Sequence, residues 1–442
     1  MMRRILIANR GEIAVRIIRA CRDLGLTAIA VYSEADRAAL HVQMADEAYC
    51  IGPAPAHDSY LNIKNILTVA IEKNVDAIHP GYGFLAENAN FAALCEKENI
   101  KFIGPSSHVI ERMGDKAEAR KTVASQGVPT IPGSPDIVPT VEEALDIAKQ
   151  YGYPVMIKAT AGGGGKGMRV AHDAKEMKTA FQQATREAEA AFGNGAVYIE
   201  KFIVAPRHIE VQIAQDQHGQ AVHFGERDCS VQRRHQKLIE EAPSPFVDDV
   251  LRDKMGVAAV QVALAVGYEG VGTVEFLVDA DKNFYFMEMN TRIQVEHPIT
   301  EEVTSVDLVK EQFTIARGDQ LSVKQEEIQM TGWAMECRIN AEDVDKDFQP
   351  SPGTITSLLA PGGIGVRLDS AAHMHSVISP YYDSMIAKLI VTGKTREETL
   401  IRLERALREF QIEGVKTTIP FHLAFLQREA FRQGNYDTSI LE

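Results

Sequence analysis

Residues 161–168 read Ala-Gly-Gly-Gly-Gly-Lys-Gly-Met, and this stretch is the strongest local indication of the fold. Its five glycines leave backbone N–H groups able to approach a polyphosphate closely. A strand-like segment, 168–171, follows, whereas a Rossmann dinucleotide site needs a helix there and a Walker A loop needs Lys-Ser or Lys-Thr. The pattern therefore predicts a mobile glycine-rich hairpin tip that closes over phosphates. The alternative, an ordinary surface turn, needs only one or two glycines.

Two lysines near this stretch occupy positions from which an ammonium group can point into a cleft. Lys158 ends the apolar strand 154–157, and Lys116 follows Gly114-Asp115 at the start of a predicted helix. Each, taken alone, is also compatible with a solvated surface lysine.

A second hairpin, further along the chain, carries oxygen donors. Glu275 interrupts the apolar strand 274–278, and after a turn the returning strand carries Glu288 and Asn290, which lie two residues apart and therefore on one face. Carboxylate and amide oxygens beside a polyphosphate are the ligands that Mg²⁺ prefers. The apolar neighbours of Glu288 predict burial on both faces, which disfavours the alternative of a hairpin with a solvated face.

Polar residues continue directly beyond this hairpin. If residues 292–297 are extended, Arg292, Gln294 and Glu296 share one side and present a fixed cation, an amide and a potential general base to one small anion. Arg338 lies in another strand-like segment and also invites an anionic partner. Surface salt bridges could explain each residue separately. Nothing in the sequence around Cys229 indicates the lowered thiol pKa that a nucleophile would need.

The remaining sequence predicts an α/β and α+β protein of three domains. Residues 1–113 alternate strands and helices, as in a doubly wound parallel sheet, with loops 9–12 and 80–83 at the carboxyl ends of strands. Neither loop has the glycine fingerprint of a dehydrogenase. Residues 114–331 combine antiparallel strands with helices, and residues 332–442 form a third, α+β domain.

Composition excludes several classes of protein. The chain has 442 residues and a net charge of −14, which disfavours binding to nucleic acid or to an anionic membrane. Its five cysteines are scattered and lack metal-site spacing, and no apolar run is long enough for a signal peptide or a membrane span. We therefore expect a cytoplasmic protein.

At this point the sequence resembles a known family. The glycine-rich hairpin, the Glu275/Glu288-Met289-Asn290 hairpin and Glu200-Lys201 on a predicted strand resemble an ATP-grasp ligase. The resemblance to biotin carboxylase is carried by four further motifs, from Arg4 to about Tyr436: Asn9 to Ala14, His79 to Gly83, Arg227 to Lys237 and Arg292 to His297. It implies an N-terminal Rossmann-like domain, a central ATP-grasp domain with a mobile lid at about 131–203, and a C-terminal biotin carboxylase domain.

The resemblance also implies roles for individual residues. ATP phosphates would be held by Lys116, Lys158 and the loop residues Gly163, Gly164, Gly165, Lys166 and Gly167. The adenine would be lined by Glu200, Lys201, Phe202 and Ile203, with His208, Gln232 and His235 around the nucleotide. Mg²⁺ or Mn²⁺ would be bound by Glu275, Glu288 and Asn290. Bicarbonate would lie among Lys237, Arg292, Gln294 and the Val295 backbone, with Glu296 as its base, and biotin would meet Arg338 and Tyr82.

The implied reaction makes carboxyphosphate from ATP and bicarbonate and then carboxylates biotin, as the first half-reaction of acetyl-CoA carboxylase or of a pyruvate or other acyl-CoA carboxylase. Its implied partners are a biotin carboxyl carrier protein, carboxyltransferase subunits and a second copy of the chain. We expect biotin on a separate carrier, because the Met-Lys pair 177–178 lies in a predicted helix and lacks the Met-Lys-Met of carrier domains.

Three alternatives stay open at this stage. If the chain were another ATP-grasp carboxylate ligase, the Arg292 to Glu296 cluster and the third domain would be unexplained. A silent partner-binding or regulatory protein would not need complete acid, base and metal positions. A dehydrogenase would need the missing glycine fingerprint.

Overall fold

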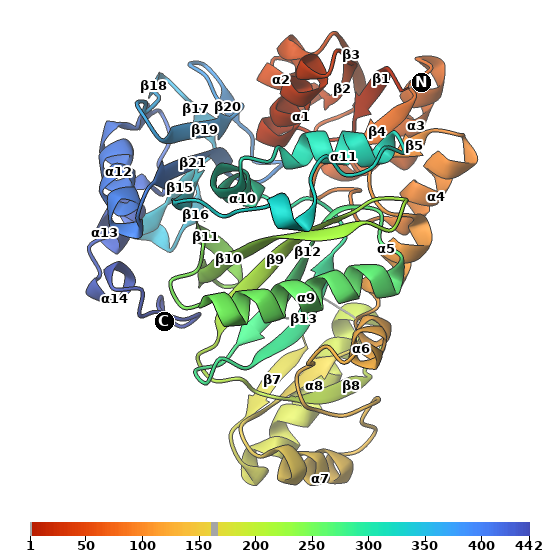
Figure 1. Ribbon diagram of the computed structural model, residues 1–442, viewed down its shortest axis with the longest axis vertical. Coiled ribbons are helices and arrows are strands. Elements are labelled where there is room, and N and C mark those ends of the chain that lie inside the picture. The colour runs from red at the N-terminus through yellow and green to blue at the C-terminus, as the bar shows by residue number, and fades with distance from the viewer. Residues whose placement is uncertain (1, 161–166) are drawn as a thin grey trace.

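The N-terminal part of this computed structural model, which describes residues 2–160 and 167–442, is built on a parallel five-stranded sheet of order β3-β2-β1-β4-β5 (Figure 1). The strands are β1 (Arg4–Ile7), β2 (Thr27–Ser33), β3 (Glu47–Gly52), β4 (Ala77–His79) and β5 (Lys101–Phe102). The helices around them are α1 (Gly11–Asp23), α2 (Leu40–Met44), α3 (Ile63–Glu72), α4 (Ala89–Lys97) and α5 (Ser107–Gly114). Ile5, Leu6 and Ile7 are fully buried, because parallel strands are covered on both faces. The predicted doubly wound sheet is confirmed.

The two loops predicted at the carboxyl edge of this sheet lie side by side. The Nδ2 amide of Asn9, which follows β1, donates to the carbonyl oxygens of Pro80 and Tyr82, both at 2.7 Å. Asn9 thereby fixes the loop that follows β4 against the start of α1.

A smaller antiparallel sheet of order β7-β6-β8 forms a separate lobe at the bottom of Figure 1. Its strands are β6 (Val155–Ala159), β7 (Met168–Ala171) and β8 (Val197–Lys201), and the helices α7 (Val141–Tyr151) and α8 (Ala174–Phe192) pack on them. Helix α6 (Lys116–Ser125) contacts α9 (Asp249–Val266) and β13 (Phe284–Asn290) instead. Gly167 begins the return from the glycine-rich stretch at φ +72°, and a Cβ there would lie 2.9 Å from that of Ala159. This position therefore requires glycine.

The largest sheet has eight strands, all antiparallel to their neighbours, in the order β13-β12-β9-β10-β11-β14-β21-β19. Its strands are β9 (Arg207–Gln215), β10 (Ala221–Arg233), β11 (Gln236–Ala242), β12 (Gly270–Val278), β13 (Phe284–Asn290), β14 (Trp333–Asn340), β19 (Val366–Ser370) and β21 (Met385–Gly393). The sheet crosses the boundary that the sequence predicts at residues 331/332. Strands of the third predicted domain thus continue the sheet of the second.

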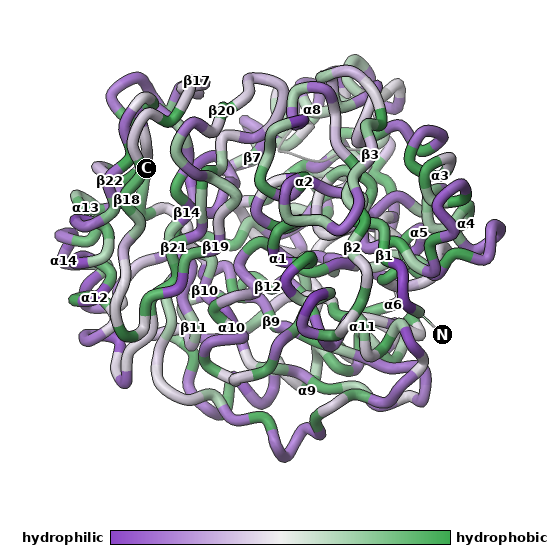
Figure 2. Tube along the Cα trace, turned by 90° about the horizontal axis from the view of Figure 1, so that it is seen from above, coloured by the Kyte–Doolittle hydropathy of each residue, from purple (hydrophilic) through white to green (hydrophobic). Residues whose placement is uncertain are grey.

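Helices and short strand pairs cover this sheet. The helices are α9 (Asp249–Val266), α10 (His297–Thr304), α11 (Leu308–Ala316), α12 (Arg396–Glu409), α13 (Ile419–Phe425) and α14 (Glu429–Arg432). The strand pairs are β15 (Glu342–Asp343) with β16 (Gln349–Pro350), β17 (Gly353–Thr354) with β20 (Val377–Ile378), and β18 (Ser357–Leu359) with β22 (Gln411–Glu413). Seen from above, α12, α13 and α14 lie along one flank and α3 and α4 along the other (Figure 2).

Residue spacing explains why α12 forms and which face it buries. Thr395 caps its N-terminus by accepting a hydrogen bond from the Glu398 N–H. Leu400, Leu403 and Leu407 recur at helical spacing and are buried against β14 and β21. No helix among residues 2–160 and 167–442 combines the length and apolar character that a membrane span requires.

Candidate active site

One large cleft lies between the three-stranded lobe, the eight-stranded sheet and the C-terminal part of the chain. Its volume is about 2370 Å³, and it is lined by residues from 115 to 442. Pockets for one drug-sized ligand occupy roughly 300–1,000 Å³. This cleft therefore has room for a nucleotide and a second substrate together.

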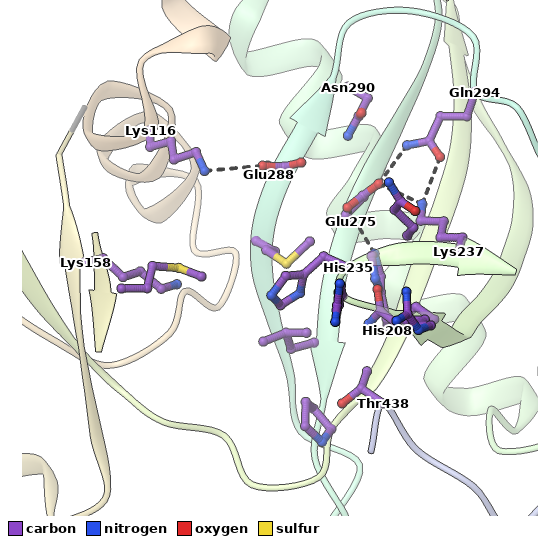
Figure 3. Close-up of a pocket in the computed structure, with 18 of the residues that line it drawn as sticks. Lys116, Lys158, His208, His235, Lys237, Glu275, Glu288, Asn290, Gln294 and Thr438 are labelled. Atoms are coloured by element: carbon purple, nitrogen blue, oxygen red, sulfur yellow. Dashed lines mark hydrogen bonds and ion pairs between the residues drawn. The ribbon is translucent and has the colours of Figure 1, made fainter. Parts of the chain in front are cut away.

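The predicted metal hairpin lies on one wall of the cleft. Glu275 on β12 is the register partner of Glu288 on β13, so the two carboxylates are neighbours on one face (Figure 3). Glu275 accepts hydrogen bonds from Gln294 Nε2 at 2.7 Å and from Lys237 Nζ at 3.1 Å, and lies 3.0 Å from His208 Nε2. Burial alone would raise the pKa of Glu275, but the charges of Lys237 and His208 hold it well below its usual value.

The other carboxylate, Glu288, is held at a raised pKa, first by desolvation and then by the charge of Glu275. Two adjacent carboxylates of this kind suit a divalent cation, because the cation would relieve their repulsion. The residues therefore fit Mg²⁺, although Asn290 Oδ1 also accepts a hydrogen bond from Arg292 Nη2 at 2.9 Å. The predicted burial of β13 on both faces is wrong: β13 is an edge strand, and Met287 and Glu288 line the cleft.

The predicted phosphate-binding lysines approach from the opposite wall (Figure 3). Lys116 Nζ lies 3.8 Å from Glu288, and Lys158 Nζ forms an ion pair with Glu200. Glu200 also pairs with Arg120 at 3.0 Å. Of the predicted loop residues only Gly167 is described, since Gly163, Gly164, Gly165 and Lys166 lie outside the described residues.

The residues predicted around the adenine share this part of the cleft. Glu200 and Lys201 end β8, and the cleft lining also includes Phe202, Ile203, His208, Gln232 and His235. Lys201 Nζ itself donates to the carbonyl oxygens of Gly152 and Tyr153 at 3.0 and 2.9 Å. Its ammonium thus holds the segment before β6.

Lys237 is the centre of the site. Its Nζ lies within hydrogen-bonding distance of four side chains: Glu210 at 2.6 Å, Glu296 at 2.6 Å, Glu275 at 3.1 Å and Gln294 at 3.1 Å. Burial would lower the pKa of this ammonium, but the surrounding carboxylates raise it well above its usual value. Lys237 is therefore a permanent cation that gathers the metal hairpin and the predicted base around itself.

Glu296 lies between two cations. Its Oε1 is 2.6 Å from Lys237 Nζ, and its Oε2 accepts a hydrogen bond from Arg338 Nη2 at 3.0 Å. Burial would raise its pKa, but the charges of Lys237 and Arg338 lower it below its usual value. Glu296 is thus ionised at neutral pH and can accept a proton.

Residues 291–296 converge by a different geometry from the one predicted. They form bends and a turn that leads into α10, so no extended alternation places Arg292, Gln294 and Glu296 on one side. Gln294 and Glu296 meet because both contact Lys237, whereas Arg292 is held by Glu87 at 2.9 Å.

Several supporting carboxylates were not predicted. Glu210 pairs with Lys237 and with the fully buried Arg227, Glu87 holds Arg292, and Glu240 accepts a hydrogen bond from Arg338 Nε at 2.6 Å. Burial raises the pKa of Glu240 to about 7, against the opposing charge of Arg338. Glu210 had no comparable local signal: it occupies a regular polar position between Ile209 and Val211 in the alternation of β9, which is typical of a solvated side chain.

Two further residues have clear positions. Tyr82 donates its hydroxyl to Glu12 on α1, and it is absent from the described lining of the large cleft. The Cys229 thiol is fully buried, and burial raises its pKa well above the usual value. A thiol with a raised pKa is inert, which agrees with the absence of any nucleophile signal in the sequence around it.

Comparison with known proteins agrees with this geometry. Residues 1–110 match the biotin carboxylase N-terminal domain, residues 115–324 the carbamoyl-phosphate synthase L chain ATP-binding domain, and residues 336–442 the biotin carboxylase C-terminal domain. Biotin carboxylase 1 of Bacillus subtilis is 60% identical, over 100% of this chain and 98% of its own length. The chain belongs to the biotin carboxylase family.

Two further relatives show how widely this family is used. A pyruvate carboxylase subunit of Methanothermobacter thermautotrophicus is 55% identical over 100% of this chain and 90% of its own length. A solved structure with a TM-score of 0.94 is the biotin carboxylase domain dimer of the Hydrogenobacter thermophilus 2-oxoglutarate carboxylase, in complex with MgADP, ADP and bicarbonate. It is 50% identical in sequence, and the match covers 100% of this chain and 97% of that one. As a member of this family, the chain is an ATP-dependent ligase that forms a C–N bond, with Mg²⁺ as its metal and carrier-bound biotin as a substrate.

Proposed function

We propose that this chain carboxylates biotin on a separate carrier protein, with the residues around Lys237 and Glu296 performing the chemistry. The observation that carries this proposal is the position of Glu296: it is buried, ionised, 2.6 Å from Lys237 and 3.0 Å from Arg338. Glu296 therefore lies between Lys237, which contacts the metal hairpin, and Arg338, which is predicted to meet biotin.

In the first step, Lys237, Arg292, Gln294 and the Val295 backbone would bind bicarbonate, and Glu296 would remove its proton. Two fixed cations lower the cost of the second negative charge on the resulting carbonate. A carbonate oxygen then attacks the γ-phosphorus of ATP, giving carboxyphosphate and ADP. Lys116 and Lys158 would neutralise the phosphate oxygens.

The metal would be held by Glu275, Glu288 and Asn290, and it supplies charge neutralisation at the phosphates. The pairing of Glu275 with Glu288 in register supports this role. Glu200, Lys201, Phe202 and Ile203, with His208, Gln232 and His235, would enclose the adenosine part.

In the second step carboxyphosphate breaks down to CO₂ and phosphate, the phosphate takes the proton from biotin N1′, and N1′ attacks CO₂ to give carboxybiotin. Arg338 would stabilise the enolate-like biotin anion, because its guanidinium stays charged and is fixed by Glu240. Tyr82, which Glu12 holds outside the described lining of the cleft, would be a second biotin contact.

The larger assembly is also part of the proposal. We assign residues 1–113, 114–331 and 332–442 to three domains, with the lid at about 131–203, and expect a cytoplasmic homodimer, a biotin carboxyl carrier protein and carboxyltransferase subunits as partners. Acetyl-CoA is the proposed final acceptor. Pyruvate or another acyl acceptor is the alternative, which the Methanothermobacter relative favours.

Release of ADP in the presence of free biotin tests the proposal. We expect ADP formation that requires both bicarbonate and Mg²⁺ and yields carboxybiotin. A rate of ATP turnover that does not depend on bicarbonate would refute the assignment of the anion site. Detection of carboxybiotin among the products distinguishes this reaction from that of another carboxylate ligase.

A further inference from the structure

A buried lysine lies directly behind the turn that carries the predicted bicarbonate-binding residues. Lys388 interrupts the apolar strand β21, and its side chain is 0% exposed. Its Nζ donates to the carbonyl oxygen of Val295 at 2.9 Å and lies 3.1 Å from Glu12 Oε1. Burying an ammonium group is costly, and an apolar residue would serve packing alone more cheaply. A specific task for this charge is therefore expected.

The peptide groups on both sides of Val295 are fixed by buried side chains. His297 Nδ1 lies 2.7 Å from the carbonyl oxygen of Gln294, while Lys388 holds the carbonyl oxygen of Val295. The Gln294 carbonyl shares a rigid peptide plane with the Val295 N–H, and the Val295 carbonyl shares one with the Glu296 N–H. Holding the two oxygens therefore fixes the direction of the Val295 N–H and the start of Glu296.

His297 is suited to this task because burial holds its pKa well below the usual value, so the ring stays neutral. A neutral ring that faces a carbonyl oxygen with Nδ1 carries its proton there. His297 is also the first residue of α10, so the helix itself anchors this end of the turn.

Lys388 also connects the turn to two other parts of the protein. Glu12, its ion-pair partner, belongs to α1 of the N-terminal sheet and accepts the hydroxyl hydrogen of Tyr82. Arg338, which binds Glu296, is the register partner of Lys388 on β14. One ammonium thus contacts the bicarbonate turn directly, and contacts the predicted biotin residue Tyr82 through Glu12.

We propose that Lys388 is a positioning residue that, together with His297, fixes the peptide groups around Val295 for bicarbonate binding. This inference rests on the proposed function. It predicts that loss of Lys388 weakens the use of bicarbonate while ATP is still bound normally, because no described contact of Lys388 involves a residue assigned to the nucleotide.

Steady-state kinetics of Lys388→Met test the proposal. We expect the KM for bicarbonate to rise at least about tenfold, since small displacements of a binding group have effects of this size or larger. The KM for ATP should stay within about twofold. A parallel rise in both KM values would overturn the proposal, because it would indicate general disruption.

In the single variant Glu12 loses its ion-pair partner, and a second variant removes that effect. Lys388→Met with Glu12→Gln also removes the charge of Glu12, the ion-pair partner of Lys388, so we expect it to fold more stably than the single variant and still to show the raised bicarbonate KM. If the double variant had the bicarbonate KM of the unmodified protein, the proposal would be wrong.

Arg396→Met is the matched control. Arg396 pairs with the buried Glu241 in the same part of the chain, away from the turn. We expect it to lower thermal stability and leave the bicarbonate KM unchanged; an equal rise in that KM would refute a local role for Lys388. If the unmodified protein formed no ADP in response to bicarbonate, the proposed function itself would fail, which is a distinct result.

Discussion

Replacing Glu296 by alanine removes the carboxylate between Lys237 and Arg338. Both cations keep other partners: Lys237 keeps Glu210 and Glu275, and Arg338 keeps Glu240. The loss of stability should therefore be smaller than the roughly 3–5 kcal/mol typical of a buried charge left without any partner. The folded protein remains available for kinetic measurement.

The effect on rate should be much larger. A positioned general base contributes about 10²-fold to 10⁴-fold, so the rate constant for ADP formation should fall by at least about 10²-fold, or nearly 3 kcal/mol of activation free energy. ATP affinity should change little, because no described contact of Glu296 involves the predicted adenine residues. Glu296→Gln is the control: it keeps the shape of the side chain but cannot take a proton, and should be equally slow. A variant that kept its rate constant and lost ATP affinity would contradict the assignment.

Three other predictions concern the metal hairpin, a buried histidine and the carrier of biotin. Glu288→Gln should abolish Mg²⁺-dependent turnover while ATP still binds weakly, and near-normal rates would remove the metal assignment. Burial lowers the pKa of His422 to about 4, so the neutral ring contributes stability above pH 6.5, and this contribution, about 3 kcal/mol, is lost as the pH falls from 6.5 to 4. The free energy of unfolding of His422→Gln, measured in urea, should lack that part of the loss. Parallel pH dependences of this free energy in the variant and the unmodified protein would contradict the argument. After co-expression with a biotin ligase, streptavidin blotting should find no biotin on this chain, because the Met-Lys pair 177–178 lies inside helix α8 with Met177 buried. A stoichiometric band would refute a carrier in trans.

The parts of the fold that the sequence predicted best have strong local signals. Helix α7 illustrates such signals, because Thr140 caps its N-terminus and its buried residues Ala144 and Ala148 lie on one face. Glu275 and Glu288 could be paired in advance because both interrupt apolar strands joined by a short turn. In such cases residues close in sequence determine the structure.

The parts that the sequence did not predict depend on contacts between distant segments. Nothing local to residues 332–340 indicates that this strand pairs with β11 and continues the central sheet. Glu87 binds Arg292, which lies about two hundred positions further along the chain. Glu240 binds Arg338, which lies about one hundred positions further along. Periodicity cannot reveal such pairs, because it reports only which face of an element is apolar.

The continuous eight-stranded sheet limits how this chain can be divided. Strands β11 and β14 face one another across the predicted boundary at residues 331/332, and Ile239, Glu240, Glu241 and Ala242 are paired with Cys337, Glu336, Met335 and Ala334. A protein shortened to residues 1–331 would leave β11 as an open edge, with a row of unpaired N–H and C=O groups next to buried apolar side chains. Exposed edges of this kind pair with other chains. Expressing the first two domains alone should therefore give aggregates, whereas co-expressed halves should reassemble along this strand pair.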